Sequence, residues 1–304
     1  MLETLTVSKA FAKTHHALPP PTSPVLRVDW MQPGPPTLPT AIAFTGFGHR
    51  LDPWRRLRLP GWRLGVVEFP IERPPDDPWT LGALVPQIDA LWREAPRRAL
   101  LSFSFGGAGA TAVANAIAEA NAGVEEGASA KPVLAAPILA APDFAAYVAP
   151  VQWARAPWSV LKKIPARKRL SVLKNFARGG AAVLGPLAAR LGNPAVRDFV
   201  NIVERYVGWD FVAYYLPYLD WIGTTKKTLR DWQSHPWPTL LVGADRDNVI
   251  PVAPMPAEVA RYAPDVAYVE VEGVHYNALD RAAGEIRAWA ARAPAGELHS
   301  RGPR

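Results

Sequence analysis

A serine stands between small residues where a predicted strand turns into a predicted helix. The apolar run RALLSFSF at 98–105 predicts a buried strand, and apolar side chains recur at helical spacing over 106–120. Small residues two positions to either side, Ser102 and Gly106, allow a sharp turn that exposes the Ser104 hydroxyl at the strand's end. This arrangement is typical of a nucleophile. The alternative is a buried strand followed by an ordinary Gly-rich turn.

A serine nucleophile needs a neighbouring base that takes its proton. Only His275, in the segment EVEGVHYN, lies directly after the last predicted strand, so it is the candidate base. We expect surface or packing roles for the other histidines: His15, His16, His49, His235 and His299.

The base needs an acid that orients the imidazole ring and stabilises its protonated form. The segment LLVGADRDNVIP supplies two candidates, Asp245 and Asp247, immediately after a predicted strand and between Ser104 and His275 in chain order. Asp245 lies closer to the end of the strand. The residue types alone do not decide which of the two carboxylates orients the imidazole.

The elements around these residues alternate between strands and helices. Near-continuous apolar runs predict buried strands at 41–48, 62–70, 98–105, 131–139, 238–245 and 266–274. Helical periodicity predicts helices at 81–94, 106–120, 253–263 and 278–293. This alternation predicts an α/β fold with a mostly parallel central sheet flanked by helices.

Two parts of the chain break the alternation. The N-terminal segment is rich in Pro and predicts at most one edge strand, at 25–30. A stretch of about a hundred residues after Asp143 reads as helices and loops, which indicates an inserted helical cap. The predicted organisation is a lead-in at 1–39, a core at 40–142 and 237–293, a helical cap at 143–236 and a C-terminal tail at 294–304.

The positive charge of the chain is concentrated in the predicted cap. The 304 residues carry a net charge of +7, and no acidic residue lies between Asp143 and Asp198. A basic cluster in this gap could be a solvated face, a docking site for an anionic substrate such as an acyl-CoA, or a peripheral contact with an anionic membrane. No nucleic-acid recognition fold accompanies it. The cluster consists of Lys162, Lys163, Arg167, Lys168 and Arg169.

Several classes of protein are excluded by what the sequence lacks. With no cysteine, the chain has no disulfide, thiolate metal site or cysteine nucleophile. No cluster of His and carboxylates suggests a metal, and no phosphate-cradling motif suggests a cofactor, so we expect neither. No apolar run is long enough for a membrane span, and the polar N-terminus does not resemble a secretory signal, so a cytoplasmic location is expected.

The order of SFSFGG, LLVGADRDNVIP and the His275 loop resembles the α/β-hydrolase superfamily, with Ser102 replacing the first Gly of G-x-S-x-G. The family pattern places the acid before x-x-V/I-P, which implies Asp247 and leaves Asp245 as its near rival. Asp143 is a third candidate, because some members take their acid from the earlier strand. Its alternative role is a helix N-cap.

The resemblance also implies an oxyanion hole made by backbone N–H groups. Its donors would be the N–H groups of Phe47, which follows Thr45 and Gly46, and of Phe105, directly after the serine. Gly46 as a plain turn glycine is the alternative.

The function implied is a metal-free serine hydrolase that cleaves a carboxylic ester or thioester through an acyl-enzyme, with the cap setting substrate choice. An acyltransferase or a C–C bond hydrolase could use the same triad. A protein of another class would be non-catalytic and bind an anionic ligand or surface through its basic cap. Relatives with an Asp nucleophile, such as dehalogenases and epoxide hydrolases, are disfavoured because position 104 is Ser. The oligomeric state is left open.

Overall fold

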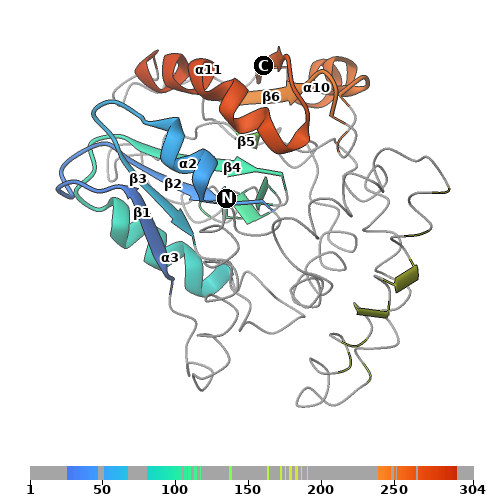
Figure 1. The fold of residues 1–304 in the computed structure, drawn as a ribbon. Coiled ribbons are helices and arrows are strands. Elements are labelled where there is room, and N and C mark those ends of the chain that lie inside the picture. Colours follow the sequence, from blue (N-terminus) through green and yellow to red (C-terminus); the bar gives the residue numbers. More distant parts are fainter. Residues whose placement is uncertain are drawn as a thin grey trace.

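The computed structural model describes residues 26–46, 51–67, 81–104, 239–247, 252–264 and 266–292, with isolated residues and short pieces between them. Figure 1 shows the elements in chain order: β1 (Val28–Gln32), β2 (Thr40–Phe44), α2 (Asp52–Leu57), β3 (Arg63–Val67), α3 (Leu81–Trp92), β4 (Arg98–Phe103), β5 (Pro137–Ile138), β6 (Leu240–Ala244), α10 (Met255–Tyr262), β7 (Ala267–Val271), the 3-10 helix η3 (His275–Asn277) and α11 (Ala278–Arg292).

The strands form a mostly parallel sheet, as the sequence predicts. Their order is β1-β3-β2-β4-β5, in which β3, β2, β4 and β5 are parallel and β1 is antiparallel at one edge. The strands β6 and β7 form a parallel pair, and β6 contacts β5. Because parallel strands end at the same edge of a sheet, the segments after β2, β4, β6 and β7 can meet there.

Successive side chains of the central strands face opposite helical layers. Ala41 and Ala43 of β2 belong to one buried cluster with Trp54 of α2 and Ile286 of α11, and Figure 1 shows these two helices on the same side of the sheet. The intervening Ile42 is fully buried on the other face, where α3 contacts β2. Burial on both faces explains why the strands read as continuous apolar runs.

The helix α2 was not expected from the sequence. It begins at Asp52, with Pro53 in its first turn, where the missing N–H of Pro costs no helical hydrogen bond. Its Trp54 is buried against the sheet, and its exposed Arg56 makes two hydrogen bonds to Asp280 of α11, at 2.8 and 2.7 Å. The Asp-Pro pair was the available signal, but six residues are too few for helical periodicity to show.

The expectation of a buried strand over 266–274 is wrong for β7. Ala267 and Glu270 are exposed and the other residues are half-buried, because among the described strands β7 pairs only with β6 and forms an edge. The Tyr268 side chain packs over Gly243 of β6. A Cβ atom at Gly243 would lie 2.6 Å from the Tyr268 hydroxyl oxygen. The alternation of Glu with Val in this segment was the signal of a half-exposed strand.

Tyr268 is expected to make the protein sensitive to alkaline pH. Burial, and secondarily the neighbouring Glu270, raises the pKa of Tyr268 to about 12 from its ordinary value of 10.0. The folded state therefore favours the neutral phenol, so this stabilisation is complete below pH 10 and is lost as the pH rises towards 12. The free energy of unfolding, measured with urea, should fall more between about pH 8 and about pH 11 in wild type than in Tyr268→Phe. Equal losses would contradict this expectation.

Candidate active site

Ser104 lies at the sharp turn that follows β4. Its backbone φ is +50°, in the left-handed region that non-glycine residues rarely adopt. Its carbonyl oxygen accepts a hydrogen bond from Gly107 N–H at 2.9 Å, and Gly106 and Gly107 are already helical. A non-glycine residue held in this conformation at a strand end is the backbone signature of a nucleophile elbow.

Gly106 is required because the end of β2 passes very close to this turn. A Cβ atom at Gly106 would lie 2.2 Å from the carbonyl oxygen of Phe44 and 2.5 Å from that of Thr45. Both contacts are with backbone, which cannot rotate away as a flexible side chain could. The small residue two positions after Ser104 therefore allows β2 and the turn to pack together.

Two Gly→Ala substitutions should change stability in opposite directions. Gly106→Ala forces a backbone clash and should lower the free energy of unfolding by about 1–3 kcal/mol. Gly284→Ala is the matched control, because Gly284 is exposed within α11 and a Cβ there meets nothing within 4 Å. Alanine should raise the free energy of unfolding there by about 0.5–1 kcal/mol. Urea unfolding of both variants measures the two changes in the free energy of unfolding. A Gly106→Ala variant as stable as wild type would contradict the close packing.

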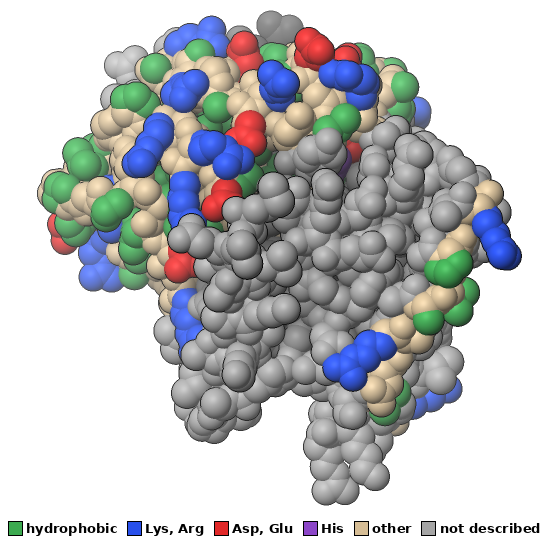
Figure 2. All heavy atoms as spheres, in the orientation of Figure 1, with side chains coloured by type: hydrophobic (Ala, Val, Ile, Leu, Met, Phe, Trp, Pro, Cys, Tyr) green, Lys and Arg blue, Asp and Glu red, His purple; other side chains and the backbone are tan. Residues whose placement is uncertain are grey.

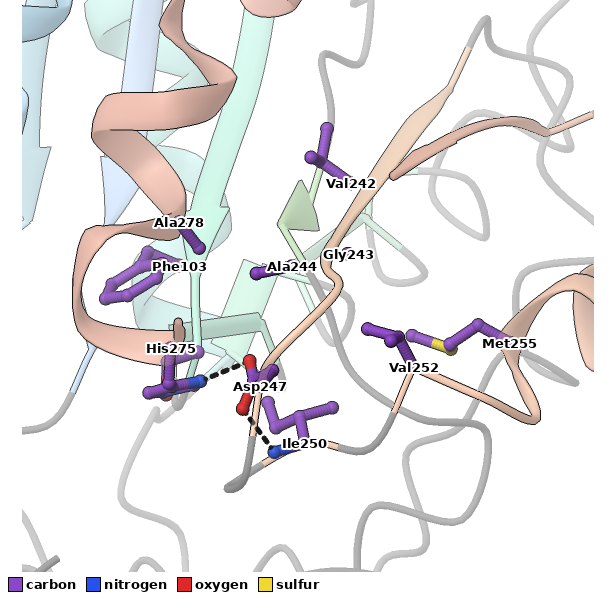
Figure 3. A pocket seen from close by; sticks show the side chains of 11 residues that line it. Phe103, Val242, Gly243, Ala244, Asp247, Ile250, Val252, Met255, His275 and Ala278 are labelled. Carbon is purple, nitrogen blue, oxygen red and sulfur yellow. Dashed lines mark hydrogen bonds and ion pairs between the residues drawn. The ribbon is translucent and has the colours of Figure 1, made fainter. Parts of the chain in front are cut away.

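His275 bridges Ser104 and Asp247. Its Nε2 lies 2.7 Å from Ser104 Oγ, and its Nδ1 lies 2.7 Å from Asp247 Oδ2. The side chains of His275 and Asp247 are 11% and 8% exposed, and Ser104 is 7% exposed, so the chain of hydrogen bonds is mostly shielded from water. The Phe103 ring stacks on the imidazole at 5.4 Å between centroids. Figure 3 shows His275 and Asp247 pointing toward each other beside Phe103.

The geometry gives each imidazole nitrogen a different task. A carboxylate only accepts hydrogen bonds, so Nδ1–H donates to Asp247. In a neutral ring, Nε2 is then the acceptor that faces the Ser104 hydroxyl. This arrangement can remove the hydroxyl proton as the oxygen attacks an electrophile.

The two rival carboxylates after β6 make different contacts. Asp247 reaches the imidazole with Oδ2, and its Oδ1 accepts a hydrogen bond from Ile250 N–H at 2.7 Å. Asp245 instead accepts a hydrogen bond from the backbone N–H of Gly273, at 2.8 Å. This bond, with a smaller effect of Arg246, lowers the pKa of Asp245 below its ordinary value. Of the two, Asp247 therefore lies where an orienting acid is needed.

The expected oxyanion donors and the third candidate acid are outside the described residues. Phe47, Phe105 and Asp143 all fall in this group. Gly46, which precedes Phe47, is described and buried, and a Cβ there would lie 3.1 Å from the Ser104 Cβ atom. The loop that begins after β2 thus starts beside Ser104.

A small hollow, partly open to solvent, adjoins Ser104, Asp247 and His275. Its walls are mainly apolar and come from the ends of β4 and β6 and from the start of α10. The apolar residues around it in Figure 3 include Phe103, Val242, Ile250, Val252 and Met255.

Charge on the described surface is mixed in sign. Figure 2 shows Lys and Arg side chains interspersed with Asp and Glu over the sheet and its helices. Of the basic cluster, only Lys163 is described, and it is exposed; Lys162, Arg167, Lys168 and Arg169 lie outside the described residues. The described residues contain no group of three His, Asp or Glu that could hold a metal ion. None of their helices is both long and apolar enough to cross a membrane.

Sequence reasoning missed two supporting groups. The Ile250 N–H is held by the Asp three residues earlier, a local pattern that D-x-x-I signals. The Asn277 side chain accepts a hydrogen bond from Val274 N–H at 2.8 Å, and its position two residues after His275 carried no signal by itself.

Comparison with known proteins identifies the architecture. No protein-family model matches the sequence, and no curated protein does. Among solved structures, the chain is similar to MGS-M2, described as an alpha/beta hydrolase enzyme from a Medee basin deep-sea metagenome library, at 10% identity and a TM-score of 0.55 over 88% of this chain and 95% of that one. It is similar to Rv0554 from Mycobacterium tuberculosis at 16% identity and a TM-score of 0.50, over 88% and 92% of the two chains. The chain therefore has the α/β-hydrolase fold.

Proposed function

We propose that the protein is a serine hydrolase that cleaves a carboxylic ester or thioester through an acyl-enzyme. The observation that supports this most strongly is the continuous hydrogen-bonded chain from Asp247 through His275 to Ser104, with 2.7 Å at both links. The positive φ of Ser104 adds to it, because this strained backbone presents the hydroxyl at the end of β4.

In the acylation step, Ser104 Oγ attacks the carbonyl carbon of the substrate while His275 Nε2 takes the hydroxyl proton. The Asp247 carboxylate stabilises the imidazolium that forms. When the tetrahedral intermediate collapses, the bond to the leaving alcohol or thiol breaks and His275 gives its proton to that group. The product of this half-reaction is an ester on Ser104.

In the deacylation step, a water molecule takes the place of the leaving group. His275 removes one proton from it as its oxygen attacks the acyl carbon, and then returns that proton to Ser104 Oγ as the acid leaves. We expect the backbone N–H groups of Phe47 and Phe105 to bind the oxyanion in both steps. For an anionic substrate such as an acyl-CoA, we propose the basic cluster at 162–169 as the contact for its charged groups; a solvated face is the alternative role of this cluster.

Turnover of a chain-length series of chromogenic esters and acyl-CoAs tests the proposal. Wild type should release free acid and leaving group in equal amounts, with a preference for one chain length. Transfer of the acyl group to an added alcohol in place of water would indicate an acyltransferase instead. No turnover of any member, combined with binding of an acyl-CoA, would favour a non-catalytic binding protein.

A further inference from the structure

The backbone around His275 is tied to the segment that carries Asp247. Directly after β6, Asp245 N–H donates to the carbonyl of Val271, the last residue of β7, and Arg246 N–H donates to the carbonyl of Gly273, each at 3.0 Å. The parallel pairing of the two strands therefore continues into the two turns. This places the segment before His275 directly beside the segment before Asp247.

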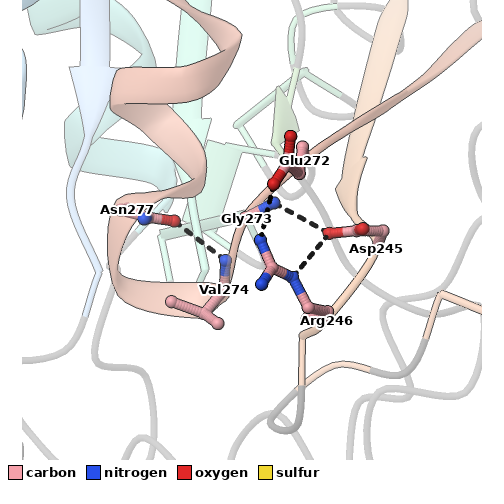
Figure 4. Close-up of polar contacts among 6 residues, drawn as sticks. All are labelled: Asp245, Arg246, Glu272, Gly273, Val274 and Asn277. Atoms are coloured by element: carbon pink, nitrogen blue, oxygen red, sulfur yellow. Dashed lines mark hydrogen bonds and ion pairs between the residues drawn. The ribbon is translucent and has the colours of Figure 1, made fainter.

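Two side chains accept hydrogen bonds from the backbone N–H groups of Gly273 and Val274, the two residues before His275. Asp245 Oδ1 accepts a hydrogen bond from Gly273 N–H at 2.8 Å, and Asn277 Oδ1 accepts one from Val274 N–H, also at 2.8 Å. Figure 4 shows both side chains directed at this stretch of backbone from opposite sides. The segment is thus held from the β6 turn and from the 3-10 helix that begins at His275.

The Asn277 and Arg281 side chains pack closely against Gly273. A Cβ atom at Gly273 would lie 2.7 Å from Asn277 Oδ1 and 3.2 Å from Arg281 Cγ. By contrast, Arg246 pairs with Asp245 and Glu272 on the exposed side, at 3.5 and 3.1 Å, where ion pairs contribute little. The two side-chain acceptors therefore add to the main-chain bond from Arg246 N–H as specific restraints on the segment.

We propose that Asp245 and Asn277 are positioning residues that hold the backbone before His275, so that its imidazole stays within hydrogen-bonding distance of Ser104. The inference rests on the proposed function. Neither residue touches the reacting atoms, and each acts through the Gly273–Val274 backbone. A displacement of about 1 Å at a catalytic group can lower a rate by on the order of a hundredfold, so modest loosening of this segment should be measurable.

Kinetics of four variants provide the first test. Asp245→Ala and Asn277→Ala should each lower kcat roughly tenfold with little change in KM, because the loss affects alignment and not substrate binding. Asp245→Asn and Asn277→Asp keep an oxygen acceptor and should recover most of the lost rate. The control is Glu285→Ala on the exposed side of α11, which should match wild type. Equal losses in the Ala variants and their conservative counterparts would overturn the proposal.

The Nδ1 proton of His275 gives a readout that does not depend on turnover. Its hydrogen bond to Asp247 should shift this proton far downfield in NMR spectra, and His275→Ala identifies the signal by removing it. We expect the signal to broaden or disappear in Asp245→Ala and Asn277→Ala while the proteins remain folded by circular dichroism. An unchanged signal in both folded variants would refute the positioning role. If wild type shows the signal and the variants lose it but no ester is turned over, the proposed function fails and the restraint on His275 stands.

Discussion

Ser104→Ala is expected to lower kcat for ester hydrolysis by a factor on the order of 10⁴ to 10⁶. The substitution removes the oxygen that lies 2.7 Å from His275 Nε2, so no acyl-enzyme can form. KM and the unfolding midpoint should change little, because alanine fits the same turn. The measurement is steady-state hydrolysis of the best chromogenic ester, with a circular dichroism melt of the same sample.

Ser102→Ala is the matched control for that loss. Ser102 lies two residues earlier on β4, is 1% exposed, and its hydroxyl has no hydrogen-bond partner within the described structure. Removing this hydroxyl should leave kcat close to that of wild type. If Ser104→Ala and Ser102→Ala retain equal activity, Ser104 is not the nucleophile.

Asp247→Asn is expected to lower kcat by a factor on the order of 10⁴, the second largest effect. The amide keeps the size of the side chain but removes the charge that stabilises the imidazolium. Its NH₂ group can also face Nδ1 and so favour the wrong tautomer of His275. Steady-state kinetics with the same ester measure the loss.

Asp245→Asn distinguishes the two neighbouring acids. Asp245 binds the Gly273 backbone and not the imidazole, and Asn keeps the oxygen that accepts this bond. Its loss of charge should therefore cost much less than that of Asp247, and less than the roughly tenfold loss expected for Asp245→Ala. The reverse order, with the larger loss at Asp245, would show that Asp245 and not Asp247 orients the base. Similar losses in both variants would indicate that the two carboxylates act as one unit.

The fold class could be predicted because strands that are buried on both faces appear in the sequence as near-continuous apolar runs. The runs that became β2, β3, β4 and β6 are mostly apolar, and each strand is buried along its length. The half-exposed β7 was misjudged because its alternation of Val with Glu was read as part of an apolar run. The cap expected at 143–236 lies almost entirely outside the described residues.

The candidate site could be predicted in part because its residues follow strands in a fixed chain order. Ser104, Asp247 and His275 each come shortly after a strand of the parallel sheet, and strand ends of this kind meet at one edge. Composition and spacing could not decide between Asp245 and Asp247, because the hydrogen-bond partners that distinguish them come from a segment 28 positions away. The bond from Asp245 to Gly273, across 28 positions, depends on strand register, which the sequence does not state.

The most direct test of the serine hydrolase proposal is the mass of the protein after reaction with a fluorophosphonate. We expect one adduct per chain, and peptide mapping should place it on Ser104. His275→Ala should react far more slowly, and Ser104→Ala should remain unmodified. An adduct on a different residue, or an equal rate of modification in Ser104→Ala, would contradict the assignment of Ser104 as the activated nucleophile.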